Sequence, residues 1–471
     1  MHQDAEFRKG VREAIGDPRI RRTFRARMDL LMAKRRSAFP DPEEWDDLRR
    51  AATGIRADNI SRLPKLLEQL EKNCTRNGIR VHWAETADDA NQTVLEIMRG
   101  HDALQLIKGK SMVSEEMGLN GYLAARGIDC LESDLGEFIV QLAGERPSHI
   151  IAPAIHKDRA QVARLFKENF PDVSYTEDIK ILTGDARRLL RRKFLEAPVG
   201  LTGVNFAVAE TGTLCLVENE GNGRLCTTLP KVHIAVMGIE KVVEKLSDIP
   251  PLLDILVRSA TGQSITTYFN MISSPRRRDE RDGPEEVHLV LLDNGRSRIC
   301  QDRELDATLR CIRCGACMNH CPVYSRLGGH AYPGTIPGPI GALLEPQIAG
   351  LDRLGMLPTA STLCGACSEV CPVGIPIPEL LNRLRAEGVK RDPEGIAGSG
   401  SRRRFREALV WRLWQLIFSR PQIYCVAVFF ATRVPAVLPR LFGPWIRSRS
   451  LPIPAEKNLH DICLKRGVEH E

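Results

Sequence analysis

The spacing of apolar residues changes along the chain and divides it into segments of different structural type. In residues 1–75, apolar side chains recur every three or four positions between charged ones, which predicts amphipathic helices. From about residue 76, short apolar runs alternate with helical stretches, and the runs fall at 79–83, 103–107, 128–131, 149–152 and 287–292. This alternation of strands with helices predicts an α/β fold, in which helices cover a parallel sheet.

Seven of the fourteen cysteines stand in two related runs that follow the α/β segment. The first run has the spacing C-x2-C-x2-C-x3-C-P of bacterial ferredoxins, with cysteines at Cys311, Cys314, Cys317 and Cys321. The second run ends in the same way, with Cys364, Cys367 and Cys371, and it carries Ser361 where its first cysteine would stand. Repeated runs of this kind predict a domain that binds two iron–sulfur clusters, most simply of the 4Fe-4S type.

The fourth cysteine of each run is expected to bind the cluster of the other run. The first cluster then has four ligands, namely Cys311, Cys314, Cys317 and Cys371. The second cluster has Cys321, Cys364 and Cys367, and it lacks a fourth thiolate. Ser361 is one candidate for that position, and an open corner, as in a three-iron cluster, is the other. Cys300 and His320 are weaker candidates because neither has the spacing of the repeat.

Zinc sites and disulfide frameworks also gather cysteines, but this sequence fits neither. Structural zinc takes four ligands in total, and two runs that both end in C-x3-C-P do not match its common patterns. A chain of 471 residues that is 43% hydrophobic can bury its own core without disulfides. Free thiols indicate a reducing compartment, so we expect a cytoplasmic protein.

Two loops of the α/β segment carry candidate catalytic residues. Lys108 and Lys110 lie between a predicted strand and a helix, where lysines and backbone amides can hold an anion. A helix cap formed by Ser111 is the competing interpretation. Glu210 and Arg224 flank a second strand, next to glycines that permit either close approach of a ligand or a hairpin turn.

Positive charge and aromatic residues concentrate near the end of the chain. The segment 401–450 contains ten arginines and one acidic residue, with tryptophan and phenylalanine interleaved. Basic amphipathic helices lie on anionic membranes or dock on partner proteins. We favour docking, because the large apolar residues exceed what a single surface helix needs. Membrane-surface contact is the alternative, and nucleic-acid binding is not expected from a basic stripe alone.

These patterns predict four parts. A helical segment covers 1–75, and an α/β domain covers 76–295. A mostly helical two-cluster domain covers 296–394, and a basic helical segment covers 395–471. The 42 residues between the two cysteine runs leave room for several helices, which a minimal ferredoxin does not have.

The order of these parts resembles the iron–sulfur B component of the bacterial lactate-utilisation system. The resemblance rests on 110–116, 134–145, 209–213, 219–224, 311–317 and 363–367. It implies an α/β domain similar to sugar-phosphate isomerases and CoA transferases, followed by a helical dicluster ferredoxin domain. It also implies an oxidoreductase subunit that acts with two other lactate-utilisation proteins to oxidise L-lactate to pyruvate. A redox-sensing or assembly protein without turnover is the alternative.

Overall fold

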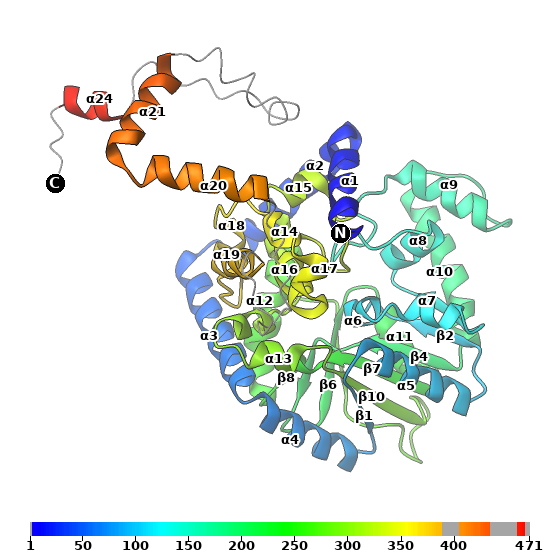
Figure 1. The fold of residues 1–471 in the computed structure, drawn as a ribbon. Helices are drawn as coiled ribbons and strands as arrows, with labels where there is room; N and C mark the ends of the chain where they lie inside the picture. The colour runs from blue at the N-terminus through cyan, green and yellow to red at the C-terminus, as the bar shows by residue number, and fades with distance from the viewer. Residues whose placement is uncertain (1, 389–404, 434–458, 467–471) are drawn as a thin grey trace. The chain divides into compact units, whose positions relative to one another are not determined.

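A parallel sheet of six strands organises the α/β part of the computed structural model, which describes residues 2–388, 405–433 and 459–466 (Figure 1). The strand order is β1-β10-β7-β4-β2-β3. The strands are β1 (Arg80–Ala84), β2 (Gln105–Lys108), β3 (Asp129–Glu132), β4 (Val199–Gly203), β7 (Val232–Gly238) and β10 (Glu286–Leu292). The predicted α/β fold class is therefore confirmed.

Helices cover both faces of this sheet, and alternate side chains of each strand enter different cores. In β7, Ile234 and Val236 pack with α5 and α7, whereas Ala235 and Met237 pack with α4. This two-residue alternation explains why the strands are apolar almost throughout. The helices that cover the sheet are α4 (Leu63–Arg76), α5 (Ala87–Gly100), α6 (Met112–Glu116), α7 (Leu119–Ala124), α8 (Leu135–Leu142), α9 (Arg159–Asn169), α10 (Ile179–Glu196) and α11 (Asn222–Thr228).

A second sheet of four strands was not predicted. Its order is β8-β5-β6-β9, and its strands are β5 (Phe206–Val208), β6 (Thr213–Glu218), β8 (Val242–Val243) and β9 (Tyr268–Ile272). After β6 the chain enters α11 through Gly221, which has a φ of +82°. The glycine pair at 221 and 223 therefore starts a helix, and the alternative of a hairpin turn is wrong.

One predicted strand is absent from the described structure. Residues 149–152 form bends between α8 and α9 and pair with no strand. Their apolar side chains are used differently: Ile150 joins a core with residues of the cluster segment, and Ile151 and Ala152 pack against that core. An apolar run indicates that its residues are buried, and here they are buried by packing against the cluster segment and not by joining a sheet.

The segment with the two cysteine runs is helical, as predicted. Its elements are α13 (Arg296–Cys300), η3 (Leu305–Arg310), α14 (Ala316–Asn319), α15 (Tyr324–Leu327), α16 (Gly338–Ala349), α17 (Leu351–Leu354), η4 (Leu357–Thr359), α18 (Ala366–Glu369) and α19 (Ile377–Glu387). It shares one hydrophobic core with the N-terminal helices and with α12 (Ile249–Thr261). For example, Phe24 packs edge-on against Tyr324, with ring centroids 5.7 Å apart.

Two of the N-terminal helices begin at aspartates. The helices α1 (His2–Gly16), α2 (Pro18–Ala38) and α3 (Pro42–Ser61) precede α4, and they lie beside the cluster segment in Figure 1. Asp17 and Asp41 cap α2 and α3 by accepting hydrogen bonds from backbone N–H groups of the first turn. A proline follows each cap, where its missing N–H costs nothing.

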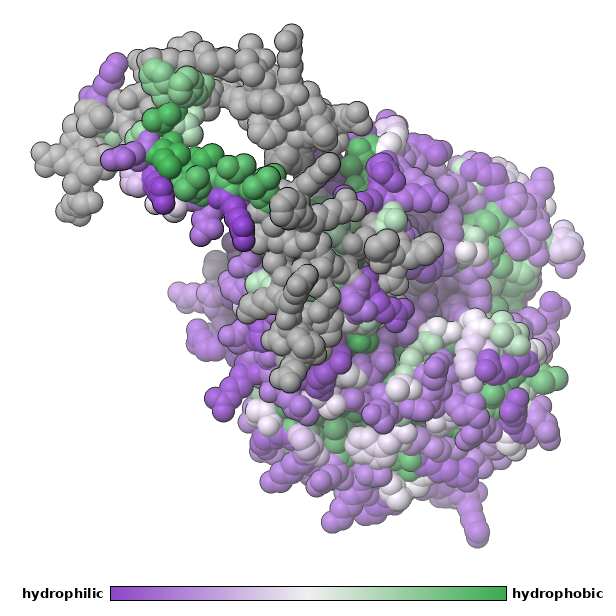
Figure 2. Space-filling model, viewed as in Figure 1, coloured by the Kyte–Doolittle hydropathy of each residue, from purple (hydrophilic) through white to green (hydrophobic). Residues whose placement is uncertain are grey.

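The chain separates into two compact units, Met1–Gly400 and Ser401–Glu471. The divisions predicted near 75, 295 and 394 stay predictions, and the predicted segment 395–471 falls partly outside the described residues. The second unit contains α20 (Phe405–Phe418), α21 (Pro421–Arg433) and α24 (Leu459–Lys465). Apolar side chains follow α20 and α21 (Figure 2). No single helix in the described ranges is long and apolar enough to span a membrane; α20 and α21 meet the length and composition only as a pair bent by 104°.

A buried ion network joins the end of the sheet to the cluster segment. The fully buried Arg296 donates two hydrogen bonds to Glu116, at 2.8 and 2.7 Å, and one to Glu240 at 2.6 Å. Burial alone would raise the pKa of Glu240, but the charges of Arg296, Lys241 and Arg313 lower this pKa to about 2. The network therefore holds its carboxylates ionised inside the protein.

The Arg296→Met variant is expected to lose about 3–5 kcal/mol of unfolding free energy, because two buried carboxylates lose their counter-charge. Anaerobic urea unfolding, followed by circular dichroism, measures the change. Arg99→Met removes an exposed arginine at the end of α5 and should change stability by no more than about 0.5 kcal/mol. An equally small effect of Arg296→Met would contradict the prediction.

Candidate cluster and ligand sites

The two cysteine runs have matching backbones. In each run the residue before the first cysteine of the Cys-Gly-Ala-Cys sequence has a positive φ: Arg313 at 61° and Leu363 at 56°. The glycine within each sequence, Gly315 or Gly365, is also left-handed and starts a four-residue helix. A non-glycine residue in this conformation is strained, so its occurrence at equivalent positions indicates one repeated ligand loop.

The repeat gathers the cysteines into two groups. Four of them line one small cavity, namely Cys311, Cys314, Cys317 and the distant Cys371. In the other group, burial together with the charges of the neighbouring Cys321 and Cys364 raises the pKa of Cys367 to about 12. The last cysteine of each run therefore lies near cysteines of the other run, and α14 packs against α18; the assignment of ligands to clusters stays a prediction.

The spacing of the sulfur atoms suits a cluster better than a single ion. Thiolates on one zinc ion lie about 3.8 Å apart, as follows from tetrahedral bonds of about 2.3 Å. Two groups of three or more potential ligand atoms within 4.8 Å of one another occur among the described residues, and neither includes a cysteine. Among the described residues, the sulfur atoms of the two runs are therefore not gathered as closely as the ligands of a single zinc ion.

Burial disfavours the ionised form of the cysteines in the runs. It raises the pKa of Cys314 to about 12 and that of Cys371 to about 11. Coordination to a metal centre would offset this cost, because a bound cation stabilises the thiolate form. Three backbone N–H groups, from Arg313, Tyr324 and Ile375, donate at 3.4 Å to the sulfur atoms of Cys311, Cys321 and Cys371.

The hydrogen bond of Ser361 reproduces that of the cysteine it replaces. The N–H of Leu363 donates to Ser361 Oγ at 3.1 Å, just as the N–H of Arg313 donates to Cys311 Sγ. Arg385 fixes the loop by donating to the carbonyl oxygen of Ser361 at 2.8 Å. The Ser361 hydroxyl therefore occupies the position that Cys311 occupies in the first run.

The other two ligand candidates are engaged elsewhere. The Cys300 thiol donates to the Ile60 carbonyl oxygen at 3.5 Å, at the joint between α13 and α3. His320 Nδ1 lies 2.9 Å from the Ala316 carbonyl oxygen of its own helix. His320 also lines a cavity of about 800 Å³ beside Cys321.

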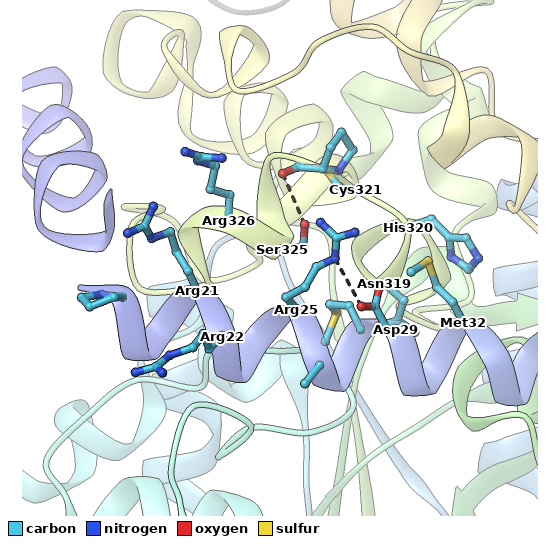
Figure 3. Close-up of a pocket in the computed structure, with 14 residues that line it drawn as sticks. Arg21, Arg22, Arg25, Asp29, Met32, Asn319, His320, Cys321, Ser325 and Arg326 are labelled. Atoms are coloured by element: carbon cyan, nitrogen blue, oxygen red, sulfur yellow. Dashed lines mark hydrogen bonds and ion pairs between the residues drawn. The ribbon is translucent and has the colours of Figure 1, made fainter. Parts of the chain in front are cut away.

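That cavity is a basic groove, defined by Arg21, Arg22, Arg25 and Arg326. Figure 3 shows the guanidinium groups of Arg21, Arg25 and Arg326 around the opening, near Cys321. Asp29 is the acidic residue in its lining, and it pairs with Arg25 at 3.2 Å. The groove therefore carries net positive charge next to a predicted ligand of the second cluster.

A third cavity, of about 370 Å³, lies where the ends of two central strands meet the first cysteine loop. Gly109 and Lys110 follow β2, Thr202 lies near the end of β4, and Arg313 belongs to the cysteine loop. From β2 the chain continues to β3 on one side, whereas β4 is followed by β7 and β10 on the other. The cavity thus lies at the topological switch point, where open α/β sheets bind ligands.

One of the four candidate catalytic residues reaches this cavity. Lys110 lines it, and its buried ammonium has no hydrogen-bond partner. Lys108 is fully buried and bonded to Ser114, Glu115 and Glu132, so it belongs to an internal ion network. Glu210 accepts a bond from the Leu246 N–H on the surface, and Arg224 is exposed; neither belongs to the lining.

Sequence reasoning missed several residues of the cavity. Arg313 appeared only as a spacer between two cysteines, and the acidic residues Asp134, Glu218 and Glu220 were not singled out as candidates. Asp134 and Glu220 do lie within the stretches that carried the family resemblance. Their place in those stretches could have marked them as candidates, but sequence spacing cannot show that the stretches lie next to each other in the fold.

Three family models match the chain. A LUD domain model covers residues 67–292, a 4Fe-4S dicluster domain model covers 307–375, and a C-terminal model of lactate utilisation protein B covers 383–468. The chain is 41% identical to lactate utilization protein B of Bacillus velezensis over 97% of this chain and 96% of that protein. It is 43% identical to the protein of that name from Bacillus subtilis, over 82% and 80%.

Two further similarities concern an electron transport protein and a solved structure. The chain is 44% identical to an uncharacterized electron transport protein of Escherichia coli, over 81% of this chain and 80% of that protein. A crystal structure of a DUF162 family protein from Deinococcus radiodurans aligns with 49% of this chain and 98% of its own, at 14% identity and a TM-score of 0.28.

Proposed function

The chain belongs to the lactate utilization protein B family, and we propose that it relays electrons when L-lactate is oxidised to pyruvate. It carries two 4Fe-4S clusters, which supply one-electron acceptance and donation. The observation that supports this role best is the repeated ligand loop, whose two copies exchange their last cysteines. With that exchange, the two clusters would lie side by side, as electron transfer requires.

We assign Cys311, Cys314, Cys317 and Cys371 to the first cluster, since these four line one cavity. Cys321, Cys364 and Cys367 are assigned to the second cluster. The residues around them tune the sites: N–H groups that donate to ligand sulfurs stabilise the more reduced state and so raise the potential. Arg49 holds the second loop by donating to the carbonyl oxygens of Cys371 and Ser368, at 2.9 and 3.0 Å.

The Ser361 hydroxyl is proposed to face the remaining iron of the second cluster. The matched hydrogen bonds of Ser361 and Cys311 support this assignment, because they fix both side chains in the same relation to the loop. A hydroxyl is a weaker iron ligand than a thiolate, so this corner is the one from which iron leaves most readily.

We also propose that the protein acts together with other proteins of the lactate-utilisation system, and we expect two such partners. The basic groove beside Cys321 suits an acidic partner, because opposite charges steer the two proteins together. The apolar side chains of α20 and α21 are proposed as a further docking surface, in preference to membrane-surface contact. A cytoplasmic location remains the expectation.

Anaerobically prepared protein is expected to contain about eight iron atoms per chain and a matching amount of sulfide. Cys314→Ser should remove the EPR signal of the first cluster and Cys367→Ser that of the second, and each should abolish lactate-dependent reduction with the partner proteins. Cys300→Ser, which alters a thiol bonded to Ile60, should change neither. Zinc in place of iron, or serine variants that keep both signals, would refute the assignment. A protein with intact clusters that lactate and the partners never reduce would favour the sensing alternative.

The Ser361→Cys variant is expected to complete a four-thiolate site. Its second cluster should resist oxidative loss of iron and have an altered midpoint potential, whereas Ser361→Ala should lose iron faster than the unaltered protein. EPR of the three-iron signal after controlled oxidation measures both effects. Thr362→Cys places a thiol at the next position of the same loop and serves as the control. If Ser361→Cys and Thr362→Cys behave alike, Ser361 does not face the cluster.

Reversing charge in the basic groove should slow electron transfer. Arg25→Glu combined with Arg326→Glu is expected to lower the second-order rate constant with the partner about tenfold or more at low salt. The loss should shrink as ionic strength rises, and the EPR spectra should not change. Arg164→Glu with Lys167→Glu makes the same charge change on the exposed side of α9 and provides the control. Equal effects of the two double variants would show that net charge, and not the groove, matters.

A further inference from the structure

In the cavity at the switch point, the carboxylates have hydrogen-bond partners within the protein, whereas the cationic side chains lack some of theirs. Glu218 accepts hydrogen bonds from the Gly223 and Arg224 N–H groups, at 2.7 and 2.6 Å, and from Asn270 at 2.9 Å. Glu220 accepts a bond from the Leu135 N–H at 3.0 Å. Asp134 caps α8 by accepting from the Glu137 N–H. Each carboxylate in the lining therefore has a donor within the protein.

The two cations of the same lining each have a buried nitrogen atom without a hydrogen-bond acceptor. The ammonium group of Lys110 is buried and has no hydrogen-bond partner. The Nη1 atom of Arg313 is likewise buried without a partner, and its Nη2 atom lies 3.6 Å from Glu240, beyond hydrogen-bond distance. Buried donors without acceptors are costly, so a ligand that accepts from both of them would be held strongly.

The rest of the cavity lining includes apolar side chains and uncharged polar side chains. Leu216, Leu256 and Ala260 are apolar, and Asn205, Thr202 and Thr261 add amide and hydroxyl groups. Glu220 is exposed to solvent, and its carboxyl group adds an acceptor for a ligand hydroxyl. The cavity thus offers cations, a hydrogen-bonding acid and an apolar wall.

We propose that this cavity binds a short 2-hydroxycarboxylate or the corresponding 2-oxo acid, with the ligand carboxylate between Lys110 and Arg313. The hydroxyl or oxo group faces Glu220, and the small alkyl group faces Leu216 and Ala260. This assignment rests on the proposed function for the choice of lactate and pyruvate as the ligands. It goes beyond that function by placing an organic acid on this chain and by naming the residues that hold it.

The position of Arg313 connects the cavity with the first cluster. Arg313 stands between Cys311 and Cys314 and has a left-handed backbone conformation. Its side chain lines the acid-binding cavity, whereas the two cysteines line the separate small cavity of the first cysteine group. Ile151 supports the same arrangement, since it lines the ligand cavity and also packs against Gly315. A bound acid would therefore lie one loop away from the cluster ligands.

Isothermal titration of the complete chain, with its clusters, tests the proposal. L-lactate and pyruvate should bind, propionate should bind more weakly because it lacks the hydroxyl, and inorganic phosphate should bind least. Lys110→Gln and Arg313→Gln should each weaken lactate binding about tenfold or more. Lys180→Gln and Arg187→Gln neutralise exposed residues of α10 and should leave the affinity unchanged.

EPR of every variant shows whether the cluster loops have folded, and hydrogen exchange provides a second readout. Lactate should protect the amides of 109–111 in the unaltered protein and not in Lys110→Gln. Tighter binding of phosphate than of lactate, or unchanged lactate affinity in both cavity variants, would overturn the proposal. If lactate binds as described but never reduces the clusters with the partners, the electron-transfer role fails and the ligand site stands. If Lys110→Gln is reduced by lactate at the normal rate, the ligand site fails and the electron-transfer role stands.

Discussion

The position of the first cluster loop depends on buried arginines that bridge the α/β part and the cluster segment. Arg56 of α3 is fully buried and donates to carbonyl oxygens on both sides, at Val242 in β8 and at Leu309 and Arg310 before the first cysteine. Burying a guanidinium group is costly unless every donor is used, so these bonds tolerate little movement. The loop that begins at Cys311 is therefore fixed against the sheet by charge as well as by packing.

Because of these buried contacts, the cysteine loops and the acid-binding cavity belong to one compact unit. The N-terminal helices, α12 and the cluster segment share a core, and Arg296 ties the end of the sheet to Glu116 and Glu240. Glu240 in turn lies next to Arg313 in the cysteine loop. A site built on such a scaffold keeps its side chains in place before anything binds, which is what cluster binding and ligand recognition both require.

The sequence allowed prediction of what depends on local spacing. The two cluster ligand loops could be predicted, because three cysteines within seven residues must wrap around one centre. The parallel sheet followed from alternating apolar runs, and the place of Lys110 after a strand put it at the edge of the sheet where a cavity lies. By contrast, nothing local shows that Arg313 leaves the cysteine loop to enter a cavity, or that residues 149–152 pack on the cluster segment. Those facts arise from contacts between segments far apart in the sequence. The spacing of apolar residues indicates which residues are buried, but it does not show which segment they pack against.

With the proposed ligand assignment, the acid-binding cavity and the basic groove lie beside different clusters. The first cluster shares its loop with Arg313, which lines the acid-binding cavity, whereas Cys321 of the second cluster lines the basic groove. The exchange of Cys371 and Cys321 between the runs joins the two clusters without any intervening domain. The corner proposed at Ser361 then belongs to the cluster beside the groove, where a changed ligand would alter the potential without disturbing the cavity.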